Sequence, residues 1–270
     1  MVTGELAHGW AGTESGPVTL VLHGGGPGCH ATSDFAAVMA HRPERRWLWV
    51  DLPGYGASAP ESDADAPPLT TAAHALDCLL TDIGVRNIDV LAQSLGGSVA
   101  LRLAAERPNV FRRIVAIGSQ PAAAPAHRTG STRDPGLGAR ARAAYYGGSG
   151  PNLDKMRQMI AELEWYETNL VPEPMVRARH SAATTPTART TATANRTGED
   201  LGDHLAAVMA PTLVLWGRHD PFAGPDYAAA FADALPRGDL AVICRTAHHP
   251  QSERPEMVAA LAEAFFTDRS

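Results

Sequence analysis

The chain of 270 residues contains few cysteines, and their positions exclude two kinds of small cross-linked protein. Cys29, Cys78 and Cys244 lie far apart in the sequence and cannot all pair. None belongs to a C-x-x-C or a similar motif, so the sequence indicates neither a disulfide framework nor a zinc knuckle. The chain also lacks an H-E-x-x-H motif, and the adjacent His248 and His249 cannot share a face. We therefore expect no metal site.

Long apolar runs and an excess of positive charge are also absent. No uninterrupted apolar segment approaches the ~18 residues that a membrane span needs, and the N-terminal residues lack the order of a signal peptide. The 23 Lys and Arg residues against 29 Asp and Glu residues give a formal charge of −6, which argues against non-specific nucleic-acid binding. We expect a soluble cytoplasmic protein with a small-molecule substrate, no nucleic-acid partner and no membrane partner. A homodimer or a higher homo-oligomer is left open.

Six short apolar runs predict the strands of a mostly parallel sheet. Their nearly continuous hydrophobicity suits strands that are covered on both faces. They span residues 18–23, 47–51, 88–93, 113–118, 212–217 and 240–245. Helical patterns lie between several of them, at residues 70–83, 96–107, 226–235 and 255–266. This alternation predicts an α/β fold with helices flanking the sheet, and the N-terminal leader has room for one more strand or a hairpin.

The segment 121–206 interrupts the alternation. It contains no convincing strand, but it shows helical patterns at residues 137–146, 151–169 and 172–183. Because it lies between two strands of the predicted sheet, we interpret it as an inserted helical lid, or cap, on a core formed by residues 1–120 and 207–270. The Ala- and Thr-rich stretch 183–198 has no clear apolar period and predicts a flexible connector.

Ser94 directly follows the predicted strand 88–93 and precedes a helical pattern. A serine on such a tight turn exposes its hydroxyl group, and the helix N-terminus behind it favours developing negative charge. The small residues Ala92 and Gly96 produce the motif A-x-S-x-G, where G-x-S-x-G is the usual form. A serine that only caps the helix is the alternative. The order strand, serine, helix favours a nucleophile.

A serine nucleophile needs a base, and the base needs a carboxylate that orients it. Asp220 and His248 each follow a predicted strand, so both are expected at the carboxyl edge of the sheet, where open α/β sheets build their sites. The order Ser, Asp, His is that of α/β-hydrolases. Asp51 also ends a strand, but it leads into a tight turn, so we expect a structural role for it.

The run HGGGPG, residues 23–28, follows the first predicted strand. Consecutive glycines allow backbone N–H groups to turn toward a ligand. Together with the N–H of Leu95, one of these groups could form an oxyanion hole. A phosphate-binding loop is the other interpretation, but the run lacks the G-K-[ST] ending and the G-x-G-x-x-G pattern. We expect His23, which opens the run, to brace the loop.

Four ordered features resemble the α/β-hydrolase superfamily across nearly the whole chain. They are HGGGPG, DLPGYGAS (51–58), AQSLGG (92–97) and the tail WGRHD followed by AHHPQSERPE. Within that superfamily the chain is most similar to the meta-cleavage-product hydrolases, which cleave a carbon–carbon bond in vinylogous 1,5-diketones produced by aromatic-ring dioxygenases. The segments ATSDF (31–35) and VPEPMVRARHSAATTP (171–186) carry this closer resemblance.

The resemblance implies a role for each matching residue. Ser94 would be the nucleophile or activating group, His248 the general base that also handles ketonisation, and Asp220 the carboxylate that fixes the imidazole. Gly25 and Leu95 would supply the oxyanion N–H groups. Arg179 would bind the carboxylate of the substrate through a bidentate pair. No cofactor is implied.

Several residues depart from the pattern of that family at positions that would contact the substrate. Gln93 precedes the nucleophile where the family usually has Asn, and His249 replaces a Trp. Asp34 stands where an Asn commonly contacts the dienoate, and its carboxylate should repel an anionic substrate. We expect these three residues and Phe222 to line the substrate pocket.

The substitutions leave three function classes open. The first is a serine-dependent hydrolase that cleaves a carbon–carbon bond in the degradation of aromatic compounds. The second is a carboxylesterase, lactonase or thioesterase that acts on a small acyl substrate, as in secondary-metabolite tailoring. The third is a non-catalytic ligand receptor on the same fold, because an intact triad does not by itself prove catalysis.

Overall fold

Short, mostly apolar runs form a seven-stranded sheet in the computed structural model, which describes residues 5–60, 66–123, 133–193 and 198–268. The strands are β1 (His8–Gly12), β2 (Val18–Leu22), β3 (Arg46–Val50), β4 (Ile88–Gln93), β5 (Phe111–Ile117), β6 (Thr212–Gly217) and β7 (Gly238–Ile243). Their spatial order is β1-β3-β2-β4-β5-β6-β7. Only β1, which the N-terminal leader supplies, pairs antiparallel with its neighbour. The predicted α/β fold is confirmed.

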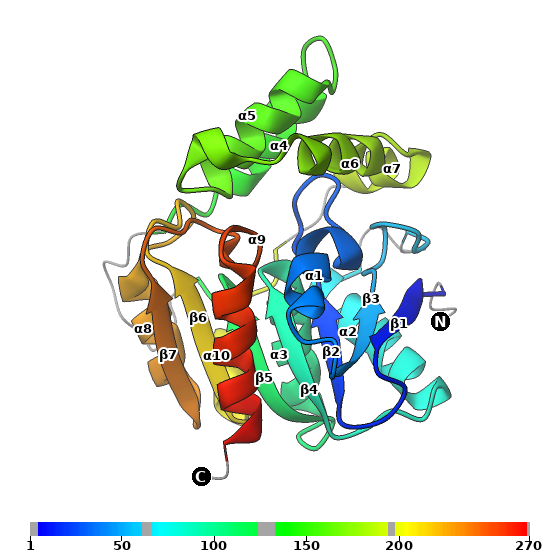
Figure 1. Cartoon of the computed structure of the whole chain (residues 1–270), viewed down its shortest axis with the longest axis vertical. Coiled ribbons are helices and arrows are strands. Elements are labelled where there is room, and N and C mark those ends of the chain that lie inside the picture. Colours follow the sequence, from blue (N-terminus) through cyan, green and yellow to red (C-terminus); the bar gives the residue numbers. More distant parts are fainter. Residues whose placement is uncertain (1–4, 61–65, 124–132, 194–197, 269–270) are drawn as a thin grey trace.

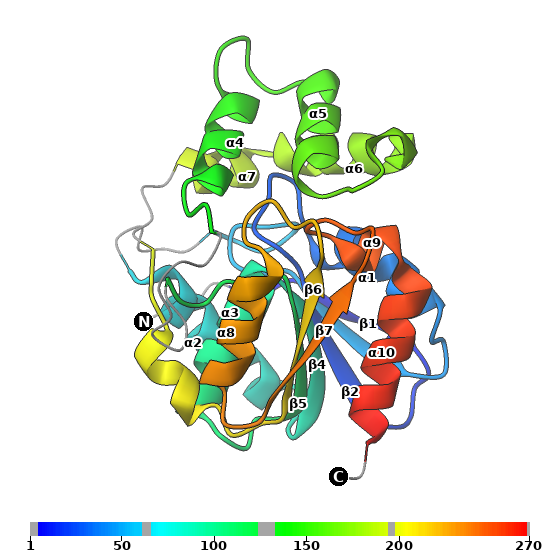
Figure 2. The ribbon, with the colours of Figure 1, turned by 90° about the vertical axis from the view of Figure 1, so that its left-hand side faces the viewer.

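Helices cover both faces of the sheet (Figure 1). They are α1 (Ala31–Ala40), α2 (Pro68–Asp82), α3 (Leu95–Glu106), α8 (Pro225–Ala234), α9 (Pro250–Glu253) and α10 (Pro255–Thr267). Figure 2 shows α2, α3 and α8 on one face of the sheet and α1 and α10 on the other. None of the helices in the described segments is long and apolar enough to cross a membrane.

The central strand β4 joins the two apolar layers of the core. Val90 and Ala92 pack into the cluster beneath α2, α3 and α8, whereas Leu91 packs into the cluster beneath α1 and α10. Successive side chains of a strand point to opposite faces, so a strand between two helical layers must be apolar at nearly every position. This explains the continuous hydrophobicity of the central runs. Because both apolar layers hold β4 in place, Ser94, which directly follows β4, has a fixed position.

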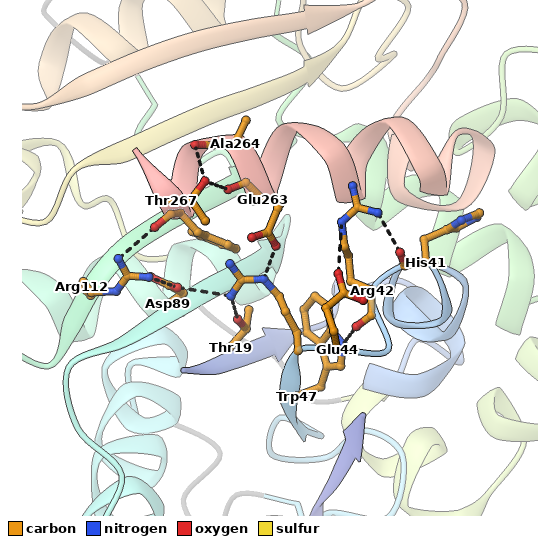
Figure 3. Close-up of polar contacts among 12 residues, drawn as sticks. Thr19, His41, Arg42, Glu44, Trp47, Asp89, Arg112, Glu263, Ala264 and Thr267 are labelled. Atoms are coloured by element: carbon orange, nitrogen blue, oxygen red, sulfur yellow. Dashed lines mark hydrogen bonds and ion pairs between the residues drawn. The ribbon is translucent and has the colours of Figure 1, made fainter. Parts of the chain in front are cut away.

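A polar network ties the C-terminal helix to the amino end of the central strands (Figure 3). Arg45 donates to Glu263 of α10 at 2.5 Å and to the Thr19 hydroxyl at 2.7 Å, and it lies 3.5 Å from the Asp89 carboxylate. Arg112 pairs with the same buried carboxylate. A buried charge needs such partners, because desolvation without them is costly. The network lies at the amino ends of β2 and β4, away from Ser94.

Four further helices lie above the carboxyl edge of the sheet in both views (Figures 1 and 2). They are α4 (Leu137–Tyr146), α5 (Leu153–Leu163), α6 (Glu173–Ala183) and α7 (Pro186–Thr193), with the short helices η2 (Thr168–Leu170) and η3 (Gly202–Ala207) following α5 and α7. They have their own apolar cluster, which includes Tyr145, Met156, Ile160 and Val176. The predicted lid, 121–206, contains α4 to α7 and η2, whereas η3 ends beyond it at Ala207 and packs Leu205 into the core cluster. Residues 124–132 and 194–197 of the predicted lid lie outside the described segments. Its function as a lid stays a prediction.

Two predictions for this segment are wrong in detail. The stretch expected to be a connector contains the helix α7. Thr185, just before this helix, accepts the Ala188 amide, and Thr191 packs against Gly54. Residues 194–197 of that stretch lie outside the described part. The helix expected over 151–169 ends at Leu163, and the next residue, Glu164, pairs with Arg179 of α6.

Candidate active site

Ser94 occupies the turn between β4 and α3 with φ 48° and ψ −109°. This strained backbone conformation costs about 1–3 kcal/mol, and the surrounding structure must enforce it. The Ser94 amide donates to the Ile117 carbonyl at 2.8 Å, and the Gly96 amide donates to the His23 carbonyl at 3.1 Å. A Cβ atom on Gly96 would lie 2.6 Å from the Leu22 carbonyl oxygen. The close approach of helix and strand therefore explains the glycine two residues after the serine.

His248 and Asp220 lie beside this turn and form a buried pair. The Nδ1 atom of His248 lies 2.7 Å from the Oδ2 atom of Asp220, and the other carboxylate oxygen accepts the Phe222 amide at 2.9 Å. The Asp220 carboxylate accepts the hydrogen bond of the Nδ1–H group, which leaves Nε2 as the basic nitrogen. The ring of Phe222 lies 4.3 Å from the His248 ring and limits its rotation. The imidazole is therefore fixed in one tautomer and one orientation.

The surroundings also set the basicity of His248. Burial alone would lower its pKa, but the charge and the hydrogen bond of Asp220 hold the pKa above its usual value of 6.5. The nearby carboxylates of Glu164 and Asp34 act in the same direction. The raised pKa makes the imidazole a stronger base toward the serine proton.

Ser94 and His248 line the same cavity, whose volume is about 410 Å³. Gly25 and Leu95 line it too. In the described parts of the chain, the amides of these two residues donate to no protein acceptor. Two free N–H groups on a cavity wall beside a serine can stabilise a negatively charged oxygen. Gln93, His249 and Phe222 also line this cavity, as the sequence predicted for them.

The glycine run is held from below by His23. Its Nδ1 atom donates to the Gly24 carbonyl at 2.7 Å, while its Nε2 atom accepts the Leu52 amide at 2.9 Å. Burial lowers the pKa of His23, in agreement with a neutral ring that has one donor and one acceptor. In a trans peptide the N–H points away from the C=O, so the bond to the Gly24 carbonyl fixes the direction of the Gly25 N–H. The bracing role predicted for His23 is confirmed.

Asp51 and Asp34 also support loops. Asp51 accepts the amides of Ala31 and Ala57, so its predicted structural role is confirmed. Asp34 was expected to face the substrate, and this is wrong. Its carboxylate lies beneath the glycine run, where it accepts the Gly24 amide at 2.9 Å, and it does not line the cavity.

The expected carboxylate-binding residue, Arg179, is already paired with a side chain of this protein. Its Nη1 and Nη2 atoms donate to the two carboxylate oxygens of Glu164 at 3.0 and 2.8 Å. Its Nε atom donates to the Pro27 carbonyl at 3.0 Å. The residue is 1% exposed and does not line the cavity. Arg179 was predicted to bind the substrate through a bidentate pair, but in this structure its bidentate pair is made with Glu164.

Glu164 is the site residue that the sequence did not reveal. It lines the cavity, and the charge of Arg179 keeps its pKa below the usual range although burial alone would raise it. His249 Nδ1 lies 3.4 Å from its Oε2 atom. The only signal in the sequence was a glutamate near the end of a helical pattern, 15 residues before an arginine, and no motif has that spacing.

Cys29, Glu164 and His249 are the described residues that could hold a metal ion, because their ligand atoms lie within 4.8 Å of one another. Both oxygens of Glu164 already accept from Arg179. Burial raises the pKa of the Cys29 thiol well above its usual range, which disfavours the thiolate that metals bind. The arrangement therefore favours the ion pair over a metal.

Replacing Arg179 should destabilise the protein strongly. Arg179→Met leaves the Glu164 carboxylate buried beside Asp34 without its main partner, so we expect a loss of about 3–5 kcal/mol in the free energy of unfolding. The second substitution Glu164→Leu should recover much of that loss. Urea unfolding measures both effects, with Arg177→Met, on the exposed side of the same helix, as the control. A single variant as stable as this control would contradict the assigned pair.

The chain is similar to known proteins of one family. A model of the alpha/beta hydrolase family matches residues 19–261. A relative of similar length is the 2-hydroxymuconate semialdehyde hydrolase of Pseudomonas sp. strain CF600, which is 27% identical over 92% of this chain and 86% of its own length.

Two solved structures share the fold. The 2-hydroxy-6-oxo-6-phenylhexa-2,4-dienoate hydrolase of Rhodococcus sp. strain RHA1 has a TM-score of 0.79 and 24% identity, covering 98% of this chain and 100% of its own. A thermophilic esterase from Thermogutta terrifontis has a TM-score of 0.72 and 24% identity, covering 97% and 93% of the two chains. The chain thus belongs to the alpha/beta hydrolase family and is a hydrolase whose relatives include meta-cleavage-product hydrolases.

Proposed function

We propose that the protein is a serine-dependent hydrolase that cleaves a carbon–carbon bond in a dienoate of the meta-cleavage-product type. The observation that carries this proposal is the arrangement of Ser94 on a strained turn and a His248–Asp220 pair around one cavity. The carbon–carbon version draws its support from relatives such as the hydroxymuconate semialdehyde hydrolase.

The first half of the reaction uses His248 and the two amides. A dienol must first become a ketone, because only then does the bond to be broken lie next to a carbonyl that can accept the electron pair. His248 takes the proton from the enol oxygen and delivers it to the far carbon of the diene, which yields the ketone and a neutral imidazole. Its Nε2 atom then accepts the proton of the Ser94 hydroxyl as the oxygen attacks the distal carbonyl carbon. The resulting oxyanion lies against the N–H groups of Gly25 and Leu95.

The second half breaks the bond and releases the acid. As the tetrahedral intermediate collapses, the carbon–carbon bond cleaves, its electron pair forms an enolate, and His248 returns a proton to the leaving fragment. An acyl group remains on Ser94. Water, deprotonated by the same imidazole, then attacks the acyl carbon and frees the serine. Asp220 stabilises the imidazolium that forms in each half.

The second candidate is hydrolysis of an ester of a small carboxylic acid. It is favoured by the position of Arg179, whose guanidinium is bound to Glu164 and does not face the cavity. An ester needs no ketonisation, since its leaving alkoxide is stable without a conjugated carbonyl. The same serine, histidine and amide groups would serve both reactions.

Ser94→Ala should abolish covalent labelling by a fluorophosphonate and all turnover. We expect the wild type to bleach the yellow colour of a dienol substrate, which absorption spectroscopy follows. Ser98→Ala is the matched control, because Ser98 also lines the cavity and lies one helical turn further along α3. It should keep its labelling.

Three results would contradict parts of this proposal. Labelling that persists in Ser94→Ala would place the nucleophile elsewhere. Rapid ester hydrolysis with an unchanged dienol would replace the carbon–carbon reaction by the ester reaction. A wild type that neither labels nor turns over any acyl substrate would favour the ligand receptor.

The pH profile tests the role of Asp220. Because the pKa of His248 is raised above 6.5, kcat/KM of the wild type should fall as the pH drops through a pKa above that value. Asp220→Asn removes the charge that opposes the effect of burial, so the acid limb should move to lower pH while kcat falls by about 10⁴. Asp134→Asn, which removes a carboxylate from the same cavity, should leave the acid limb in place. An acid limb unchanged in Asp220→Asn would refute this assignment.

A further inference from the structure

The cavity wall around Glu164 does not suit an anionic substrate. Neighbouring cations keep the pKa values of Glu164 and Asp34 low although burial opposes this, so both carboxylates are charged. Arg179 compensates one of these two charges. Burial lowers the pKa of His249, although the neighbouring carboxylates of Glu164 and Asp34 raise it. An anion on this side of the cavity would meet the Glu164 carboxylate, whose partner Arg179 is already bound to it through both terminal nitrogens.

A different arginine lines the cavity without a carboxylate partner. Arg142 lies on α4, is half-buried, and donates to the Gly25 carbonyl at 3.3 Å. Within the described segments no carboxylate lies within 4.0 Å of its guanidinium. A guanidinium has five N–H donors in a planar fork, so most of its donors remain available.

The acidic groups on the same cavity wall are engaged elsewhere. Asp134 pairs with Arg140 and accepts the Gly136 amide. Glu199 accepts the amides of Leu69 and Thr70 at the start of α2. Neither carboxylate therefore neutralises Arg142.

Arg133 is the other arginine on this wall, and it has more neighbours than Arg142. Its Nε atom donates to the Gln120 side chain at 3.1 Å, and its guanidinium lies 5.9 Å from the centre of the Tyr227 ring. Of the two arginines, Arg142 lies beside the glycine run, since it donates to the Gly25 carbonyl. The amide of the same Gly25 faces the cavity, so Arg142 is the arginine close to the proposed oxyanion site.

We propose that Arg142 binds a carboxylate of the substrate, the task that Arg179 cannot perform here. The substrate class is then an acyl compound with a second, anionic group, such as a keto acid or the monoester of a dicarboxylic acid. Arg142 would hold this group through a bidentate pair near the oxyanion amides. The inference rests on the proposed hydrolase site, but it does not require carbon–carbon cleavage.

Two activated esters test whether Arg142 binds a carboxylate of the substrate. They are the mono-p-nitrophenyl ester of glutaric acid and p-nitrophenyl valerate. They have acyl chains of the same length, and only the first carries a carboxylate. For Arg142→Gln we expect a loss of at least ~30-fold in kcat/KM on the glutaric ester, mainly through KM, because the removed pair binds the anionic substrate. The loss on the valeric ester should be below about threefold. Arg140→Gln, which removes a charge from the exposed part of the same helix, should change neither.

Binding provides a readout that does not depend on turnover. Isothermal calorimetry of glutarate with Ser94→Ala should show binding, and the double variant Ser94→Ala/Arg142→Gln should lose it. The proposal would be overturned if Arg142→Gln lost kcat/KM equally on both esters, or if its kcat/KM on the glutaric ester were unchanged. Glutarate binding that survives in the double variant would overturn it as well. A selective loss in Arg133→Gln instead of Arg142→Gln would also overturn it. Failure of the dienol assay leaves these comparisons intact, so the two proposals fail separately.

Discussion

The buried pair between Arg179 and Glu164 holds three parts of the site together. Arg179 belongs to α6, Glu164 ends α5, and the third hydrogen bond of the guanidinium reaches the Pro27 carbonyl in the glycine run. A Cβ atom on Gly28 would lie 2.0 Å from the Arg179 carbonyl oxygen, so backbone contact accompanies the ion pair. Two helices above the sheet are thereby fixed to the loop that would carry the oxyanion amide.

This pair also determines which charges the cavity presents. With both carboxylate oxygens engaged, Glu164 stays ionised on the cavity wall, and Arg179 is not free to bind a substrate. Among the described residues two arginines line the cavity, and Arg142 on α4 is the one that lies beside the glycine run, without a carboxylate partner. Arg179, which matches the family's carboxylate-binding arginine in sequence, thus connects α6 to Glu164 and to the glycine run in this structure.

The catalytic chemistry depends on a simpler constraint, the shared edge of parallel strands. Ser94 follows β4, Asp220 follows β6 and His248 follows β7, so residues far apart in sequence lie together where these strands end. Such residues were recognisable from the sequence, because strand ends and tight turns leave local patterns. The contacts of Glu164 and Asp34 were not recognisable, because they depend on how the lid and the glycine run pack. The helix α7 was missed for a similar reason: it has no clear apolar period, and the packing of its Thr191 against Gly54 leaves no pattern in the sequence.

The central claim is that the anionic group of the substrate is bound by Arg142 while Arg179 stays on Glu164. A crystal structure of Ser94→Ala with glutarate, or with a carboxylate-bearing substrate, tests it most directly. We predict a carboxylate within about 3.2 Å of the Arg142 guanidinium, with both hydrogen bonds between Arg179 and Glu164 intact. A carboxylate bound to Arg179, with Glu164 displaced, would contradict the account.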